Sequence, residues 1–186
     1  AGRSTEPSGV GVDESGGIIE RARLKNAENK HISFQKIDGP VLPFPDNSFD
    51  VVTSLMSFRY LDWDPLLAEI KRVMRPGGKF LIIDMVTVPV AVGEYPRLIG
   101  DKLRTMKHQK ANARFDAALQ RLVSHPDWKK MLEYNPIRSE HEMKWYLESR
   151  FPGQKMEILN MAWHSRIVAF DSGPVENGID AKLTYP

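Results

Sequence analysis

The sequence predicts an α/β fold in which a mostly parallel sheet is covered by helices on both faces. Short apolar segments alternate with segments whose apolar residues recur at helical spacing, which is typical of strand–helix–strand units. Several strand segments are almost continuously apolar, as expected for strands of a parallel sheet that are buried on both faces. The 186 residues suit one domain and are enough to bury a sizeable core.

The first half of the chain carries the parallel strands and the helices between them. The expected strands are residues 10–13, 31–37, 49–56 and 79–85. The first expected helix is 16–26, and the second opens at Asp64-Pro65, with proline in its first turn, and stops at the Pro76-Gly77-Gly78 turn. The carboxyl ends of parallel strands share one edge of a sheet, where ligands of open α/β sheets bind.

The second half of the chain begins with helical segments. Residues 97–123 show helical spacing, and His125-Pro126 ends that helix. Ser139 and Glu142 have the spacing of a capping box, which predicts the start of a further helix.

Two final strands and a tail complete the expected domain. The strands are residues 156–159 and 165–170, and their short connection predicts antiparallel pairing. We therefore expect one domain over residues 1–171, with a helical insert at 87–137, followed by a polar, peripheral tail at 172–186.

Composition excludes several kinds of site. The chain has no cysteine, which rules out disulfides, thiolate metal ligands and a cysteine nucleophile. No cluster of histidines and acids has metal-ligand spacing, so no metal is expected. The formal net charge is only +2, so bulk charge does not indicate a nucleic-acid partner. No apolar run approaches the roughly 20 residues of a membrane helix, and no signal peptide is recognisable. We expect a cytoplasmic protein without a membrane span.

Two acids follow strands in a way that suits a nucleoside. A ribose diol offers two donors to one carboxylate, and an adenine amine suits a second acceptor. Asp13 and Asp38 each follow an expected strand, and the helix and strand between them place both on one rim. On spacing alone, turn or helix-capping acids explain this pattern equally well.

Longer runs resemble a known family. They are Gly11-Val12-Asp13-Glu14-Ser15, Leu42-Pro43-Phe44-Pro45-Asp46 and Arg72-Val73-Met74-Arg75-Pro76-Gly77-Gly78. Their order and spacing resemble the class I S-adenosylmethionine (SAM)-dependent methyltransferases, in the small-molecule branch that includes ubiquinone/menaquinone-type enzymes. The resemblance covers roughly residues 1–85 and implies SAM as cofactor and S-adenosylhomocysteine as product.

The resemblance also implies roles for single residues. Asp13 matches the acid that holds the ribose hydroxyls, and Asp38 matches the residue near the adenine amine. The other implied cofactor contacts are Gly2, Glu14, Ser15, Gly39, Ser54 and Leu55. Phe49 and Val51 match core positions, and the Pro76-Gly77-Gly78 turn matches a structural one.

One part of the family pattern is missing. The family's central first strand ends in a glycine-rich loop, of which only Ala1-Gly2-Arg3 resembles the tail. Without that strand its neighbours would carry unpaired backbone groups, at a high desolvation cost. We therefore expect the natural protein to have about 30 to 50 further N-terminal residues, the size of one strand and one helix.

The acceptor side is less defined. Methyl transfer from a sulfonium is an in-line displacement that needs no catalytic base, so the sequence identifies no catalytic residue. Arg59 and Tyr60 follow the fourth strand of the family pattern and are candidate substrate contacts, although the favoured alternative is that they pack within the protein or face solvent. Residues 97–130 hold nine Lys and Arg against three Asp. This pattern favours a solvated helix face over a site for RNA or an acidic substrate.

Four functions remain open at this point. The leading hypothesis is a methyltransferase that acts on a small molecule. The alternatives are an RNA or protein methyltransferase that uses the basic insert, a catalytically silent SAM-fold binding module and, more weakly, a nicotinamide dinucleotide-binding protein. The sequence does not indicate an oligomeric state.

Overall fold

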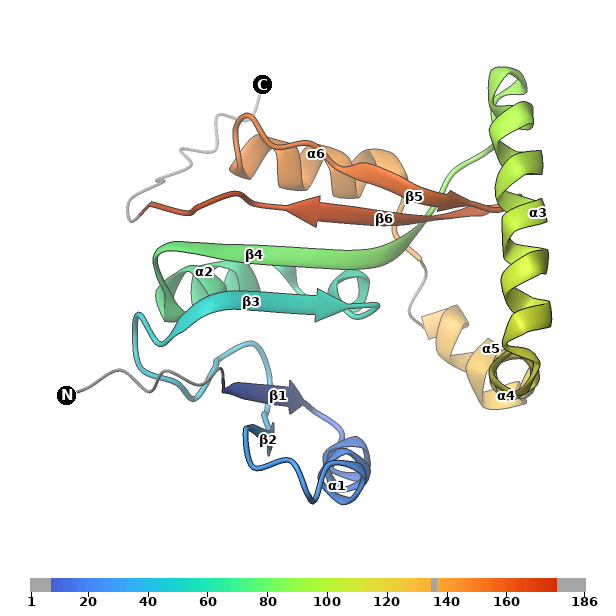
Figure 1. Ribbon diagram of the computed structural model, residues 1–186. Helices are drawn as coiled ribbons and strands as arrows, with labels where there is room; N and C mark the ends of the chain where they lie inside the picture. The colour runs from blue at the N-terminus through green and yellow to red at the C-terminus, as the bar shows by residue number, and fades with distance from the viewer. Residues whose placement is uncertain (1–7, 135–136, 177–186) are drawn as a thin grey trace.

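The computed structural model describes residues 8–134 and 137–176, and the strands among them form two sheets. The first has the order β2–β1 and the second the order β3–β4–β6–β5 (Figure 1). The strands are β1 (Gly9–Asp13), β2 (Ile32–Lys36), β3 (Phe49–Leu55), β4 (Met74–Thr87), β5 (Glu157–Met161) and β6 (Ser165–Asp171). β1 pairs parallel with β2 and β3 with β4, whereas β6 runs antiparallel to both of its neighbours. The predicted α/β class, with mostly parallel strands and an antiparallel final strand, is confirmed.

The helices fall between the strands and in one insert. They are α1 (Gly16–Lys25), α2 (Trp63–Val73), α3 (Tyr95–Ala111), α4 (Ala113–Ser124), α5 (Pro126–Tyr134) and α6 (Glu140–Arg150), with single 3-10 turns at η1 (Phe58–Tyr60) and η2 (Val92–Glu94). The Ser139 hydroxyl accepts the Glu142 N–H over 3.1 Å at the start of α6, as the capping box predicts. No helix in the described ranges is both long and apolar enough to cross a membrane.

The expected single helix over 97–123 is two helices. The chain leaves helical geometry at Asn112, where φ is −123° and ψ is 42°. The Asn112 backbone and side-chain N–H groups both donate to the His108 carbonyl, over 3.0 and 3.1 Å. An asparagine that competes for the carbonyls of the last turn ends α3 here.

The Pro76-Gly77-Gly78 turn lies inside β4 and not between α2 and a strand. α2 already ends at Val73, and the extended backbone of Met74 begins β4. Gly77 has φ +79°, which favours glycine, and a Cβ on Gly78 would lie 2.9 Å from the Arg75 carbonyl oxygen. These glycines therefore bend the start of a long strand.

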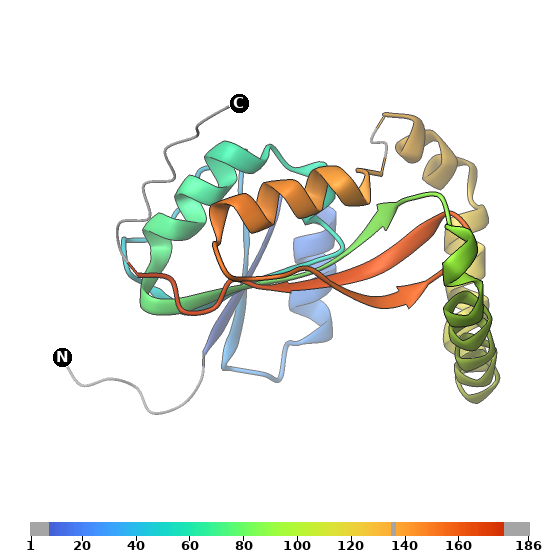
Figure 2. The same ribbon diagram turned by 90° about the horizontal axis from the view of Figure 1, so that it is seen from above.

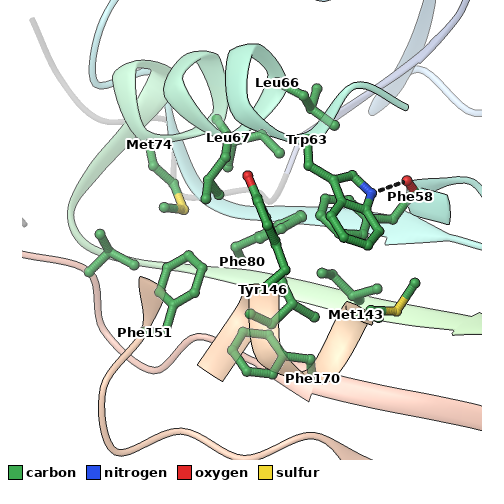
Figure 3. Close-up of a cluster of buried hydrophobic side chains, with 14 of the residues drawn as sticks. Phe58, Trp63, Leu66, Leu67, Met74, Phe80, Met143, Tyr146, Phe151 and Phe170 are labelled. Carbon is green, nitrogen blue, oxygen red and sulfur yellow. Dashed lines mark hydrogen bonds between the residues drawn. The ribbon is translucent and has the colours of Figure 1, made fainter. Parts of the chain in front are cut away.

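One hydrophobic core fills the space between the four-stranded sheet and two helices. α2 and α6 lie side by side on the same face of this sheet (Figure 2). β4 buries alternate residues toward them, including Phe80, Ile82 and Val86. The aromatic centre consists of Phe58, Trp63, Phe80, Tyr146, Phe151 and Phe170 (Figure 3).

The opposite face of β3 and β4 and the edge beside β1 are open in the described chain. Val51, Leu55 and Ile83 are 50%, 65% and 38% exposed. The expectation that Val51 is core is therefore wrong in this structure, whereas Phe49 packs against the core. The sheet divides between β1 and β3, which is where the family resemblance places its first strand.

The first residues of the expected peripheral tail are part of the core. Ser172 and Val175 are 5% and 7% exposed. The Ser172 hydroxyl accepts the Phe80 N–H over 2.9 Å, and the Val175 N–H donates to the Gly78 carbonyl over 2.8 Å. The packed part of the chain therefore extends to Val175, and residues 177–186 lie outside the described ranges.

The position of the core predicts which large-to-small side-chain substitutions destabilise the protein. Phe80→Ala should lower the free energy of unfolding by about 3–5 kcal/mol, because Phe80 is fully buried between α2 and α6. Leu24→Ala is the control, since Leu24 is 74% exposed on α1, and should change it by less than about 0.5 kcal/mol. Urea unfolding followed by circular dichroism measures both, and equal losses would contradict the assigned core.

Candidate functional site

The carboxyl ends of β1 and β2 bring the two predicted acids to one rim. β1 ends at Asp13, whose partner in the parallel register is Lys36, the last residue of β2. The Ile37 N–H donates to the Asp13 carbonyl over 3.1 Å and extends the pairing past the strand ends. Asp38 follows directly, so both acids lie at the same edge of the sheet.

The turn after β1 holds the Asp13 carboxylate. Asp13 is half-buried, and its Oδ1 accepts the Ser15 N–H over 2.7 Å. Ser15 is in turn the N-cap of α1, because its hydroxyl accepts the Ile18 N–H over 3.4 Å. Among the described residues, no group donates to Asp13 Oδ2. The carboxylate is therefore fixed through Oδ1, its Oδ2 has no donor among the described residues, and Glu14 beside it is exposed.

Asp38 and Gly39 form a more exposed second element of the rim. The Asp38 side chain is 86% exposed and pairs with Lys36 Nζ at 2.5 Å. Gly39 has φ +77°, a backbone conformation that glycine adopts without steric cost. The chain therefore turns away after Asp38 and leaves the Asp38 carboxylate at the surface.

The end of β3 supplies a third element. Ser54 and Ser57 lie with their hydroxyl oxygens 3.0 Å apart, and Leu55 between them is 65% exposed. Met56 has φ +56°, which is uncommon for a residue with a side chain, and its N–H donates to the Ile83 carbonyl over 2.7 Å. β4 thus holds a strained turn at the rim, and such turns are frequent at functional sites.

Arg59, a candidate substrate contact, lies inside the protein. It is 3% exposed, and its guanidinium pairs with Asp84, which is 0% exposed. The Arg59 N–H also donates to Asp84 Oδ2 over 2.9 Å, and the Met85 N–H donates to Oδ1 over 2.7 Å. The other terminal guanidinium nitrogen, Nη2, donates to the Tyr60 hydroxyl over 2.6 Å. This placement favours the packing alternative for Arg59 and leaves Tyr60, which is half-buried, nearer the surface.

A second arginine, Arg72, connects two of the family-like runs, residues 42–46 and 72–78. Arg72 donates to the carbonyls of Leu42 and Phe44 over 2.9 and 2.8 Å, and to Asp46 over 2.8 Å. Its guanidinium also forms a two-pronged pair with Glu69, at 2.8 and 2.7 Å. The run at 72–78 thus holds the run at 42–46 in place, which is a structural role.

Glu69 completes this clamp. Its Oε2 accepts the Leu42 N–H over 2.8 Å. The Arg72 guanidinium, followed by the Leu42 N–H, lowers the pKa of the Glu69 carboxyl to about 2. The segment from Leu42 to Asp46 is therefore fixed by charge-assisted hydrogen bonds at both ends.

The helical insert stands at the end of the sheet toward which β1, β3 and β4 run (Figure 1). Buried Arg166 of β6 ties its start to the sheet, with two bonds to Glu94 at 2.9 and 2.7 Å and an ion pair to Glu140. Asp101 of α3 accepts the Met161 N–H over 3.1 Å. The insert therefore lies at the rim side of the molecule.

Sequence reasoning missed these ion pairs. The partners of Arg59, Arg72 and Arg166 lie up to 72 residues away in the chain, and no local pattern marks them. Among the other expected contacts, Gly2 lies outside the described residues. No group of metal-binding side chains occurs within the described ranges.

Known proteins share the first half of this chain. Residues 4–82 match the family described as methyltransferase domain. The demethylmenaquinone methyltransferase of Thermus thermophilus is 35% identical over 82 residues, which are 43% of this chain and 37% of that protein. That of Lactococcus lactis is 40% identical over 44% of this chain and 34% of its own length. The ubiquinone/menaquinone biosynthesis C-methyltransferase UbiE of Hahella chejuensis is 36% identical over 44% of this chain and 35% of its own length.

Residues 4–82 of the chain therefore resemble the class I SAM-dependent methyltransferases. The matched relatives are of the ubiquinone/menaquinone type, as the sequence resemblance indicated. The matched part spans only about a third of the length of these relatives.

Solved structures extend the shared fold of this family beyond residue 82. Geranyl diphosphate C-methyltransferase from Streptomyces coelicolor has a TM-score of 0.56 at 12% identity, over 89% of this chain and 62% of its own. A SAM-dependent methyltransferase from Aquifex aeolicus has a TM-score of 0.53 at 17% identity, over 88% of this chain and 68% of its own. At these identities the likeness shows a common fold.

The buried Arg59–Asp84 pair predicts that removing one partner destabilises the protein more than replacing both. Arg59→Met should lower the free energy of unfolding by about 3–5 kcal/mol, because it leaves Asp84 buried without a counter-charge. The double change to Arg59→Met and Asp84→Leu should recover a large part of that loss. Urea unfolding measures both, with Arg21→Met on the exposed side of α1 as the control. A double variant that is no more stable than Arg59→Met would contradict the explanation.

The Glu69 clamp predicts a pH dependence. The pKa of Glu69 is lowered from 4.5 to about 2 in the folded protein, so its contribution to stability is complete above about pH 5 and is lost as the pH falls toward 2. In the Glu69→Gln variant, the free energy of unfolding should therefore decrease less as the pH is lowered from about 5 toward 2. Denaturation at a series of pH values measures it, and the exposed variant Glu20→Gln should keep the original slope. Identical slopes in all three proteins would show that Glu69 is not the group responsible.

Proposed function

We propose that the protein is a SAM-dependent methyltransferase that transfers a methyl group to a small-molecule acceptor. The observation that carries this proposal is the Asp13 carboxylate, held at the rim of a methyltransferase sheet with one oxygen uncommitted among the described residues. Asp38 lies on the same rim, at the end of the adjacent parallel strand.

The rim residues fit the nucleoside part of this cofactor. A carboxylate fixed by the Ser15 N–H suits the paired hydroxyls of a ribose, because it can accept hydrogen bonds without moving. The exposed Asp38 carboxylate suits an amine donor, and the Gly39 backbone offers a surface without a side chain. Ser54 and Leu55 at the end of β3 would lie toward the methionine part of the cofactor.

The chain contributes positioning and exclusion of water. When bound, SAM supplies a methyl group on a sulfonium, which an acceptor removes by in-line displacement at carbon. The strained turn at Met56, held by β4, fixes the end of β3 beside the reacting region. The insert of α3, α4 and α5 stands at the same end of the molecule and would limit the entry of water.

The small-molecule acceptor is supported by the type of relatives that the chain matches. Those proteins are named as methyltransferases of demethylmenaquinone or of ubiquinone/menaquinone biosynthesis, and we extend to this chain only the broader class of acceptor. Incubation with SAM labelled in its methyl group, followed by separation of small metabolites, RNA and protein from a cell extract, tests the assignment. Label in the metabolite fraction is expected, and label confined to RNA or protein would refute it.

The ribose assignment predicts the effect of one substitution. Asp13→Ala should weaken SAM binding by about 2–3 kcal/mol, the value of lost hydrogen bonds to a charged group. Titration calorimetry of the full protein measures it, and Glu28→Ala, at an exposed acid in the turn before β2, should bind like the unchanged protein. Equal affinity of the Asp13→Ala variant would overturn the ribose assignment, and absence of binding by the unchanged protein would overturn the enzyme assignment.

A further inference from the structure

Helix α3 exposes a stripe of large apolar side chains. Ile99, Leu103 and Met106 are 58%, 62% and 46% exposed. Their spacing of four and three residues places them on one side of the helix. The stripe is therefore a continuous apolar surface along α3.

This stripe is not the face by which α3 is attached to the sheet. Leu98 and Asp101 are the buried residues of α3, and Asp101 accepts the Met161 N–H. At about 100° per residue, Leu98 lies roughly a third of a turn from the centre of the stripe and Asp101 almost half a turn from it. The attachment of α3 thus leaves the stripe uncovered by the described residues.

Helix α4 repeats the arrangement. Phe115, Leu119 and Leu122 are 70%, 40% and 53% exposed and again have a spacing of four and three. No described side chain of α4 is buried. We call the two stripes taken together the apolar surface of the insert: Ile99, Leu103, Met106, Phe115, Leu119 and Leu122.

Positive charge surrounds this surface. Exposed Lys102, Lys107 and Lys110 lie on α3, and exposed Arg114 and Arg121 lie on α4. Over residues 97–130 the nine basic residues face three acids, of which Asp101 is already paired within the protein. A second copy of the same surface would bring two positive regions together, which electrostatic repulsion disfavours.

We propose that the apolar surface of the insert docks on an anionic lipid bilayer. Apolar stripes flanked by Lys and Arg are the pattern of helices that lie in the membrane interface, where the apolar side chains enter the acyl boundary and the basic ones meet anionic headgroups. This role is independent of methyl transfer and of the rim residues. The insert would carry the molecule on the membrane surface without crossing it.

Vesicle co-sedimentation of the full protein tests the proposal. We expect binding to vesicles of phosphatidylcholine mixed with phosphatidylglycerol, weak binding to phosphatidylcholine alone, and loss of binding at high salt. Leu103→Gln with Phe115→Gln, and separately Lys102→Gln with Lys107→Gln, should each weaken binding by about tenfold or more. Both pairs of positions are exposed, so circular dichroism should show an unchanged fold.

The matched control is Leu24→Gln with Lys25→Gln, an exposed apolar–basic pair on α1, which should bind vesicles like the unchanged protein. Failure of the unchanged protein to bind anionic vesicles, or equal loss in the control, would overturn the proposal. A dimer seen by light scattering that Leu103→Gln with Phe115→Gln dissociates would assign the surface to a second copy instead. SAM titration reports on the rim residues and not on the exposed positions changed here, so it separates failure of this proposal from failure of the methyltransferase assignment.

Discussion

A buried carboxylate needs a counter-charge. At the rim of the four-stranded sheet, the Arg59–Asp84 ion pair supplies it. Asp84 is fully buried in β4, and Arg59 meets it with both its backbone N–H and its guanidinium. This pairing draws the chain back onto β4 directly after β3, so the turn at Met56 has little freedom. The same path places Phe58 and Trp63 in the aromatic core, where the Trp63 indole donates to the Phe58 carbonyl. One ion pair thus links the candidate site to the packing beneath α2.

The sequence predicted those strands and helix caps that depend on residues close together in the chain. The apolar runs that became β1, β3 and β6, and the cap at Ser139, were placed within a few residues. Asp13 and Asp38 could be placed on a common rim because each follows a strand, and the strands are parallel neighbours. In each of these cases the decisive information lies within a short stretch of the chain.

Features that depend on distant partners were not predictable in this way. The bend of β4 at Gly77 and Gly78 requires Val175, almost a hundred residues later, so the sequence suggested a turn where a strand begins. Arg59 was a candidate for the substrate because nothing local reveals Asp84. The break at Asn112 has a local cause, the asparagine side chain, but apolar periodicity continues across it and concealed it.

Within the 186-residue chain, the gap between β1 and β3 has a consequence for cooperativity. β1, α1 and β2 pack mainly on one another, and the buried residue of α1, Ile19, is not part of the main core cluster. Cooperative units of this kind open at a lower free energy than the core does, because few apolar contacts hold them closed. Since this unit carries both rim acids, a nucleoside that bridges Asp13 and Asp38 would bind only its closed form. Ligand affinity and the local order of β1 would then rise and fall together.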